Sequence, residues 1–195
     1  SKSLAVETAR QEVKAKPYVK ERDKMDAVPA ISKVRRYFVE EREQKLKAYA
    51  EVCPFNVEEM HDTKIGIIAA GAAYTYAKEA LGDKASYLKL GFTYPLPIEK
   101  IKAFAAKVDT LYVVEELDPF MEEIIHEAGI PCHGKDVIPK IDELNPNIVA
   151  AGILNQKAEG VQVPDTLFVP RPPALCAGCP HRGFFYELAK RKDTV

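Results

Sequence analysis

The sequence predicts an α/β fold with three layers, in which helices cover both faces of a mostly parallel sheet. Three short apolar runs, at 64–71, 85–91 and 110–114, have the length and composition of buried strands. Each run is followed by a segment in which apolar residues recur at helical spacing. Strands that alternate with helices of about ten residues are typical of βαβ units and therefore of a parallel sheet.

The first strand–helix unit begins at Lys64. Residues 64–71 are apolar almost without interruption, as in a strand that is covered on both faces. Residues 72–81 are good helix formers, and Gly82 stands where a glycine C-cap belongs. We therefore expect a central strand followed by a helix that ends at Gly82.

The second unit consists of a strand over 85–91 and a helix that begins near Pro97. Two prolines between 92 and 97 exclude a helix there, because each restricts the residue before it. Pro97 suits the first turn of the next helix. Apolar residues recur along that helix at helical spacing: Ile98, Ile101, Phe104, Ala105 and Val108.

The third unit starts with the strand at 110–114. Asp118 is expected to cap the following helix, with Pro119 at its first position. Gly129 is expected to end this helix. Its predicted buried stripe is formed by Phe120, Met121, Ile124, Ile125 and Ala128.

The N-terminal region divides into an arm and a long helix. Residues 1–30 are crowded with charge, which predicts a linker or an arm. Ser32 is expected to cap a helix over 33–52, about 30 Å long. Acidic residues directly follow a basic cluster in this helix, which favours a solvated face over a nucleic-acid surface. The predicted apolar stripe is Val34, Tyr37, Phe38, Leu46, Tyr49 and Ala50.

The C-terminal third has fewer regular elements. Little periodicity is present over 135–144, and Asn145 with Pro146 then forms a cap and first turn for a helix through Leu154. The proline-rich stretch 162–173 predicts an extended connector between domains. A last helix is expected over 183–192, with Phe184, Phe185, Leu188 and Ala189 on one face.

Composition excludes several classes of protein. Lys+Arg 28 against Asp+Glu 29 gives a net charge of -1, whereas a general nucleic-acid binder is normally basic. No apolar run approaches the roughly 18 residues of a membrane span. Four cysteines in 195 residues do not make a disulfide scaffold, which favours a cytoplasmic protein with free or metal-bound thiols. The chain begins without methionine and stops where a new strand is due, so we expect a segment of a larger polypeptide.

The sharpest local motif is Cys176-Ala-Gly-Cys179-Pro-His181-Arg-Gly183. Three interpretations stay open, of which a tight turn or cofactor-facing loop is favoured. The second is half of a metal site, because two thiolates at this spacing can share one ion and His181 can be a third ligand. A complete site needs four ligands, and no second Cys-x-x-Cys is present. The third is a redox-active dithiol.

Other candidate residues carry weaker signals. Glu115, Glu116 and Asp118 follow a strand at the edge where α/β sheets bind ligands, so they can ligate Mg²⁺ or act as acids and bases. A helix cap with solvated or lysine-paired glutamates is the favoured alternative. The neighbours Cys132 and His133 rarely share one ion. No phosphate-binding glycine fingerprint follows any strand.

Four motifs in order resemble one family, the large (alpha) subunit of indolepyruvate ferredoxin oxidoreductase, a thiamine-diphosphate-dependent enzyme. They are Lys64-Ile-Gly-Ile-Ile, Leu88-Lys-Leu-Gly-Phe-Thr-Tyr-Pro-Leu-Pro97, Val113-Val-Glu-Glu-Leu-Asp-Pro119, and Arg171-Pro-Pro with the Cys176 to Gly183 motif. The resemblance implies oxidative decarboxylation of aryl 2-oxoacids to acyl-coenzyme A, with electrons passing through [4Fe-4S] clusters to ferredoxin. A small (beta) subunit is the implied partner.

The resemblance also implies a division of the chain. Residues 1–60 would be the arm and long helix, 61–160 a domain similar to the transketolase C-terminal domain, and 161–195 the first elements of the thiamine-diphosphate-binding domain. A loop near the cofactor is implied for Cys176, Gly178, Cys179 and His181.

The Gly-Asp-Gly motif that holds Mg²⁺ and the diphosphate in this family is absent, and so is a ferredoxin-like cysteine run. We therefore expect an inactive scaffold that by itself binds no cofactor. The alternatives are a related oxidoreductase for another 2-oxoacid, a metal-binding interaction module built on Cys176 and Cys179, and a flavodoxin-like ligand-binding domain.

Overall fold

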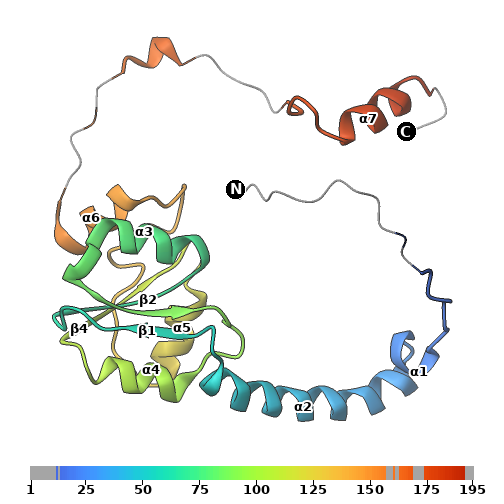
Figure 1. The fold of residues 1–195 in the computed structure, drawn as a ribbon, viewed down its shortest axis with the longest axis horizontal. Coiled ribbons are helices and arrows are strands. Elements are labelled where there is room, and N and C mark those ends of the chain that lie inside the picture. Colours follow the sequence, from blue (N-terminus) through green and yellow to red (C-terminus); the bar gives the residue numbers. More distant parts are fainter. Residues whose placement is uncertain (1–11, 13, 157–159, 161–162, 169–173, 192–195) are drawn as a thin grey trace. The chain divides into compact units, whose positions relative to one another are not determined.

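The computed structural model describes residues 12, 14–156, 160, 163–168 and 174–191 (Figure 1). The chain divides into two compact units, Ser1–Lys157 and Ala158–Val195. The sheet and most helices belong to the first unit.

The first unit is built on a four-stranded sheet with the order β1-β3-β2-β4. The strands are β1 (Val57–Glu59), β2 (Ile65–Ala70), β3 (Ser86–Leu90) and β4 (Thr110–Val114). β2 lies in the centre and pairs in parallel with β3 and β4, whereas β1 pairs antiparallel with β3. The three parallel strands confirm the predicted ones, and β1 is an additional edge strand.

Helices cover both faces of this sheet, which confirms the three-layer α/β fold (Figure 1). On one face lie α3 (Gly71–Leu81) and α6 (Pro146–Leu154), and on the other α4 (Ile98–Ala105) and α5 (Phe120–Glu127). The central strand explains the uninterrupted apolar run, because consecutive residues face opposite cores. Ile67 packs with α3 and α6, while Ile68 packs on the side of α4 and α5, and both are fully buried.

Several predicted helix ends are confirmed. Gly82 follows α3 with a φ of 54°, and Gly129 follows the end of α5 with a φ of 75°. Both values lie in the left-handed region that glycine adopts at low cost. The side chain of Asn145 accepts a hydrogen bond from the Ile148 N–H at 3.1 Å, so Asn145 caps α6 as predicted.

The start of the long helix differs from the prediction. The arm contains a short helix, α1 (Arg22–Met25), and α2 then spans Pro29–Val52. Ser32 does not cap this helix, because it lies in the first turn and its hydroxyl donates to the Ala27 carbonyl at 3.2 Å. Pro29 takes the first position instead, where its fixed φ and missing N–H suit a helix start.

The C-terminal end of α2 is attached to the sheet domain. Ala50 is the buried residue of this helix, and the Asn56 side chain donates to its carbonyl at 3.0 Å. The Glu51 carboxylate accepts from the N–H groups of Glu99 and Lys100 at 3.0 and 2.9 Å, which ties α2 to the first turn of α4. Leu46 is partly buried, whereas the other large members of the predicted stripe are exposed: Val34, Tyr37, Phe38 and Tyr49.

The second unit contains a short 3-10 turn over Asp165–Leu167 and helix α7 (His181–Ala189). The last predicted helix therefore begins two residues earlier than expected. Half of the predicted connector over 162–173, namely 162 and 169–173, lies outside the described residues. Within the part of the chain that the structure describes, no helix is long and apolar enough to cross a membrane.

Candidate functional site

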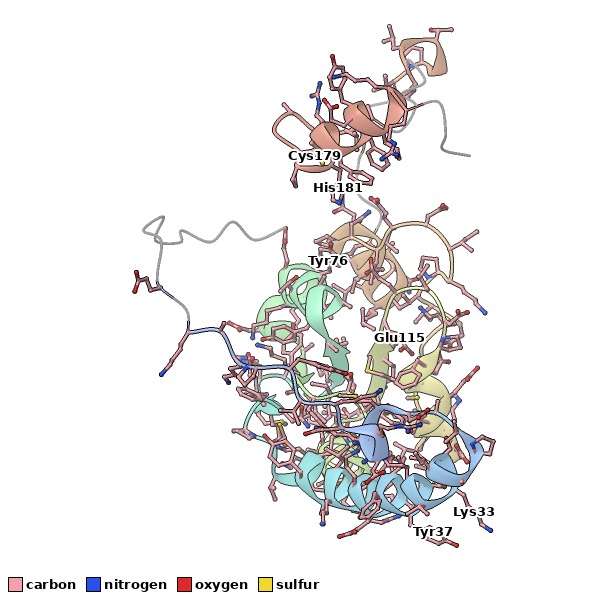
Figure 2. All side chains as sticks on the ribbon, turned by 90° about the vertical axis from the view of Figure 1, so that its right-hand side faces the viewer. Lys33, Tyr37, Tyr76, Glu115, Cys179 and His181 are labelled. Atoms are coloured by element: carbon pink, nitrogen blue, oxygen red, sulfur yellow. The ribbon has the colours of Figure 1, made fainter. Side chains whose placement is uncertain are left out.

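Glu115 occupies the carboxyl end of β4 and caps helix α5. Its carboxylate accepts hydrogen bonds from the N–H groups of Met121 at 2.9 Å and Glu122 at 3.0 Å. These are N–H groups of the first turn, which have no partner within the helix. The residue is only 8% exposed, and Figure 2 shows it among the layers of the sheet domain. A buried carboxyl group at the strand end thus accepts from the free N–H groups of the helix N-terminus.

Lys135 completes this junction. Its ammonium donates to the Glu115 carbonyl at 2.5 Å, and its N–H donates to the Glu122 carboxylate at 2.9 Å. Burial raises the pKa of Glu115, and the two N–H donors and Lys135 oppose this shift in part. Burial likewise lowers the pKa of Lys135, against the pull of the nearby carboxylates. The charged groups of Glu115 and Lys135 are therefore both bound to backbone groups.

The predicted cap at Asp118 is wrong. Its carboxylate pairs with Lys140 at 2.8 Å, which lowers the pKa of Asp118, and it makes no side-chain cap bond to α5. Leu117 has a φ of 58°, so the chain turns sharply between β4 and the helix. Phe120 also departs from the predicted buried stripe, with 48% of its surface exposed. The cap comes from Glu115, which is buried next to the N–H groups of the first turn of α5.

The third acid at this edge is engaged as well, since the Glu116 carboxylate accepts from the Leu144 N–H at 3.3 Å. Among the residues that the structure describes, no group of three or more His, Cys, Asp and Glu side chains is arranged to hold a metal ion. The favoured alternative is therefore wrong in its details, because Glu115 is the cap, Asp118 pairs with a lysine and Glu116 binds the backbone.

Cys132 and His133 have separate partners. The His133 Nδ1 lies 2.6 Å from the Asp136 carboxylate, and its ring stacks on Tyr112 with centroids 5.3 Å apart. The His126 ring contacts the Cys132 carbonyl at 3.1 Å. Cys132 is half-buried, and burial raises the pKa of its thiol to about 12. The pair is not arranged as a common ligand set.

A polar network that the sequence did not reveal fastens β1 to α3. The Glu59 carboxylate accepts from the Tyr74 hydroxyl at 2.5 Å and from the Lys78 ammonium at 2.8 Å. His61 lies 3.2 Å from Lys78 and 3.5 Å from Asp83. The Lys78 hydrogen bond lowers the pKa of Glu59, while burial and Glu59 raise that of Tyr74 to about 12. These contacts could not be predicted from the sequence, because they depend on the position of β1, and β1 itself was not predicted.

The loop at 176–182, in the second unit, contains the predicted cofactor-binding residues. It is a tight turn in which the Cys179 N–H donates to the Cys176 carbonyl at 3.1 Å, and Gly178 has a φ of 76°. The Cys179 Sγ lies 3.5 Å from the His181 Nδ1, and His181 is the first residue of α7 (Figure 2). The structure thus brings Cys179 and His181 into contact.

This loop is open to a ligand. Cys176 and His181 are exposed, Cys179 is partly exposed, and both thiols are free. A Cβ placed on Gly178 would meet nothing within 4 Å. His181 and Arg182 stand at the N-terminus of a helix, where backbone N–H groups and the helix dipole favour an anion. The arrangement can bind an anionic group or present a thiol paired with an imidazole.

The chain is similar to the indolepyruvate oxidoreductase subunit IorA of several archaea. It is 33% identical to that of Thermococcus kodakarensis over 84% of this chain and 29% of the relative. The corresponding values are 31%, 89% and 30% for Pyrococcus horikoshii, and 34%, 90% and 31% for Methanothermobacter thermautotrophicus. The resemblance inferred from the four motifs is confirmed. The chain spans about 30% of the length of these curated relatives.

Among solved structures, the chain is similar to 2-oxoglutarate:ferredoxin oxidoreductase from Magnetococcus marinus with 2-oxoglutarate, coenzyme A and succinyl-CoA bound. The match has a TM-score of 0.48 and 14% identity, and covers 67% of this chain and 24% of that one. No protein-family model matches the chain.

Proposed function

We propose that this chain, as a sequence relative of the IorA subunits, is part of a 2-oxoacid:ferredoxin oxidoreductase that acts on aryl 2-oxoacids such as indolepyruvate. The observation that carries the proposal is a similarity of 31–34% identity that extends over 84–90% of the chain. In the overall reaction, the substrate carboxylate leaves as carbon dioxide and the former carbonyl carbon forms a thioester with coenzyme A. Two electrons pass to ferredoxin.

The sheet domain acts as a scaffold in this proposal. Its acids at the carboxyl edge of the sheet cap a helix, pair with a lysine or bind the backbone. Among the described residues, every buried side-chain nitrogen or oxygen has a hydrogen-bond partner. Side chains that are engaged within the chain in this way support a structural role for the sheet domain.

Cys176, Gly178, Cys179 and His181 form a loop beside thiamine diphosphate in the complete enzyme. The loop fits an anionic diphosphate, because it is open at Gly178 and carries His181 and Arg182 at the start of α7. Thiamine diphosphate, when bound, supplies the carbon nucleophile that attacks the substrate carbonyl. The loop's part is to position the diphosphate and to bring the Cys179–His181 pair next to it. Residues 161–195 are then the first elements of the cofactor-binding domain.

The other components of the complete enzyme are assigned to parts outside this chain. They are Mg²⁺, the [4Fe-4S] clusters, the small (beta) subunit and the ferredoxin acceptor. A cytoplasmic location follows from the sequence-based expectation of reduced thiols.

The substrate class is tested on the complete enzyme, assembled from the full-length subunit and its partner. Reduction of ferredoxin is followed with indolepyruvate, phenylpyruvate, pyruvate and 2-oxoglutarate, each with and without coenzyme A. We expect the two aryl 2-oxoacids to give the highest kcat/KM, with full dependence on coenzyme A. A preference for 2-oxoglutarate or pyruvate would favour the related oxidoreductase, and no reduction of ferredoxin with any of the four would contradict the proposal.

A further inference from the structure

Helix α2 exposes a second apolar surface, distinct from the side that contacts the sheet domain. Val34 is 57% exposed, Phe38 57% and Val52 75%, although all three are large apolar residues. The side toward the rest of the unit carries the partly or fully buried residues Leu46 and Ala50. Figure 2 shows Tyr37, which is 74% exposed, on the outer surface of this helix with Lys33. Large apolar side chains that are exposed along one helix suit a contact with another molecule.

The exposed residues follow the spacing of a coiled-coil seam. Successive members lie 4, 3, 4, 3 and 4 residues apart, as the a and d positions of a heptad repeat do. All of them are exposed. The seam consists of Val34, Phe38, Glu41, Lys45, Ala48 and Val52.

The seam is complementary to itself when two copies run antiparallel. With the midpoint at position 43, Val34 lies opposite Val52 of the second copy and Phe38 lies opposite Ala48, so a large side chain meets a small one. In the central layers Glu41 lies opposite Lys45. A parallel pair would instead place Glu41 against Glu41 and Lys45 against Lys45. The order of charges thus specifies the antiparallel register.

We propose that α2 forms an antiparallel coiled coil with α2 of a second copy of this chain, centred on position 43. The paired segment is about 27 Å long at 1.5 Å per residue. In the single chain, Glu41 pairs with Lys45 one turn away, at 2.6 Å, and the dimer exchanges this contact for the same contact between copies. Exposed ion pairs contribute little, so the valine and Phe38–Ala48 layers provide the affinity and the charges provide the register.

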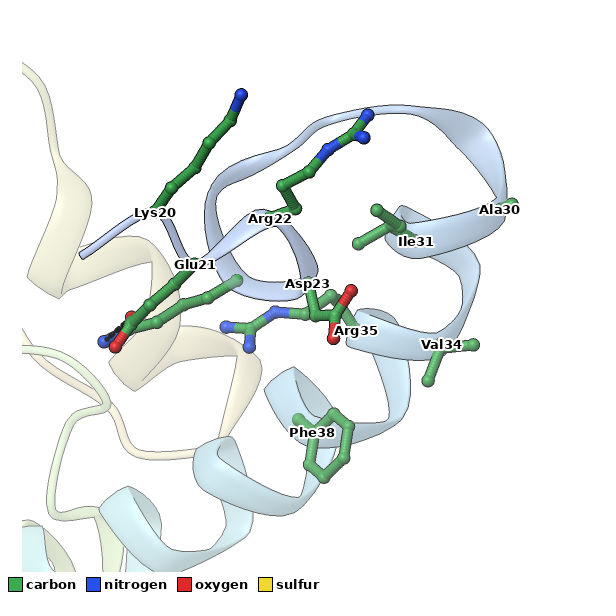
Figure 3. A pocket seen from close by; sticks show the side chains of 10 residues that line it. Lys20, Glu21, Arg22, Asp23, Ala30, Ile31, Val34, Arg35 and Phe38 are labelled. Carbon is green, nitrogen blue, oxygen red and sulfur yellow. Dashed lines mark ion pairs between the residues drawn. The ribbon is translucent and has the colours of Figure 1, made fainter.

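A hollow at the start of α2 lies where this register places Val52 of the second copy. It has a volume of about 930 Å³ and lies between α1 and the first turns of α2 (Figure 3). Val34 and Phe38 belong to its apolar lining, and charged residues of 20–24 line it from the side of α1. An apolar floor with a charged rim suits the insertion of an apolar side chain from a helix end.

The test is sedimentation equilibrium of the full 195-residue chain over a range of concentrations, with helix content checked by circular dichroism. Phe38→Glu should abolish the dimer. Glu41→Lys and Lys45→Glu should each weaken it about tenfold, because two symmetric layers become like-charged. The double variant E41K/K45E should restore it. Lys33→Glu, on the same helix outside the seam, is the control and should leave dimerisation unchanged.

Each other outcome overturns the proposal. A chain that stays monomeric to several hundred micromolar has no such interface. A dimer that tolerates Phe38→Glu uses another surface. A dimer in which the single charge variants behave like the unsubstituted chain, or in which the double variant fails to restore it, does not have the antiparallel register.

Discussion

The β4–α5 junction and the loop at 176–182 place their polar side chains in opposite environments. At the junction, Glu115 and Lys135 are engaged within the chain, with the carboxylate bound to two backbone N–H groups. In the loop, Cys176 is exposed and Cys179 contacts His181 at the open start of a helix. The acids that suggest chemistry in the sequence therefore stabilise the fold, whereas the cysteine and histidine side chains of the loop stay accessible.

Thiol reactivity should differ most between the cysteines of the sheet domain and those of the loop. Cys53 is 1% exposed, and burial raises the pKa of Cys132 to about 12, so the Cys132 thiol stays protonated at pH 8. Cys176 is exposed. We expect Cys176 to react with a disulfide reagent at least about a hundredfold faster than either, as measured by mass spectrometry of labelled peptides. All four should react alike in denaturant, and equal rates in the native chain would contradict the contrast.

Truncating an aromatic ring should destabilise the sheet domain but not the second unit. Phe104→Ala removes a fully buried ring from the core beneath α4 and should lower the free energy of unfolding by about 3–5 kcal/mol. Phe184→Ala is the matched control, because its ring in α7 is 63% exposed, and should change it by less than about 0.5 kcal/mol. Urea unfolding measures both. A similar loss for the two variants would show that α7 is packed as a core element.

The cap at α5 gives a smaller effect. Glu115→Gln keeps one oxygen for the two N–H groups of Met121 and Glu122 and turns an amide donor toward them, so it should cost about 1–3 kcal/mol. Asp118→Asn, at the residue that the sequence favoured as the cap, should leave stability nearly unchanged. The reverse order in urea unfolding would restore the sequence-based assignment.

The smallest effect is on the pH dependence of the free energy of unfolding, to which Glu59 and Glu115 should contribute with opposite signs. The pKa of Glu59 is lowered in the folded chain, so its contribution is present above the ordinary value of 4.5 and is lost as pH falls through the folded pKa. The pKa of Glu115 is raised, so its contribution is complete below 4.5 and declines as pH rises through the folded pKa.

The free energy of unfolding is measured from about pH 3 to about pH 7 for the unsubstituted chain and for Glu59→Gln and Glu115→Gln. The difference between the unsubstituted chain and each variant should rise with pH for Glu59 and fall with pH for Glu115. We expect differences below about 1 kcal/mol for Glu59, which is partly exposed. Equal slopes would contradict the assigned environments.

Features with a local physical cause could be predicted from the sequence. The apolar run at β2 predicted a strand with two buried faces, since Ile67 and Ile68 enter different cores. Gly82 and Asn145 predicted helix ends, because their preferences are local. The motif at Cys176 identified the candidate loop.

Features that depend on distant partners could not be predicted. The three residues of β1 carry no periodicity of their own, and their strand forms because β3 offers a free edge. The cap at Glu115 follows from burial at the end of β4, whereas Asp118 had the favoured spacing before Pro119. Contact between Cys179 and His181 likewise depends on the turn at Gly178.

The most direct test of the proposed division between scaffold and cofactor loop is calorimetric titration with thiamine diphosphate. The complete enzyme is compared with its Cys179→Ser and His181→Gln variants, and with Glu187→Gln on exposed α7 as the control. We expect the loop variants to raise the Kd at least about tenfold, the control to bind normally, and the isolated chain to bind no cofactor. Loop variants that bind like the unsubstituted enzyme would contradict the account.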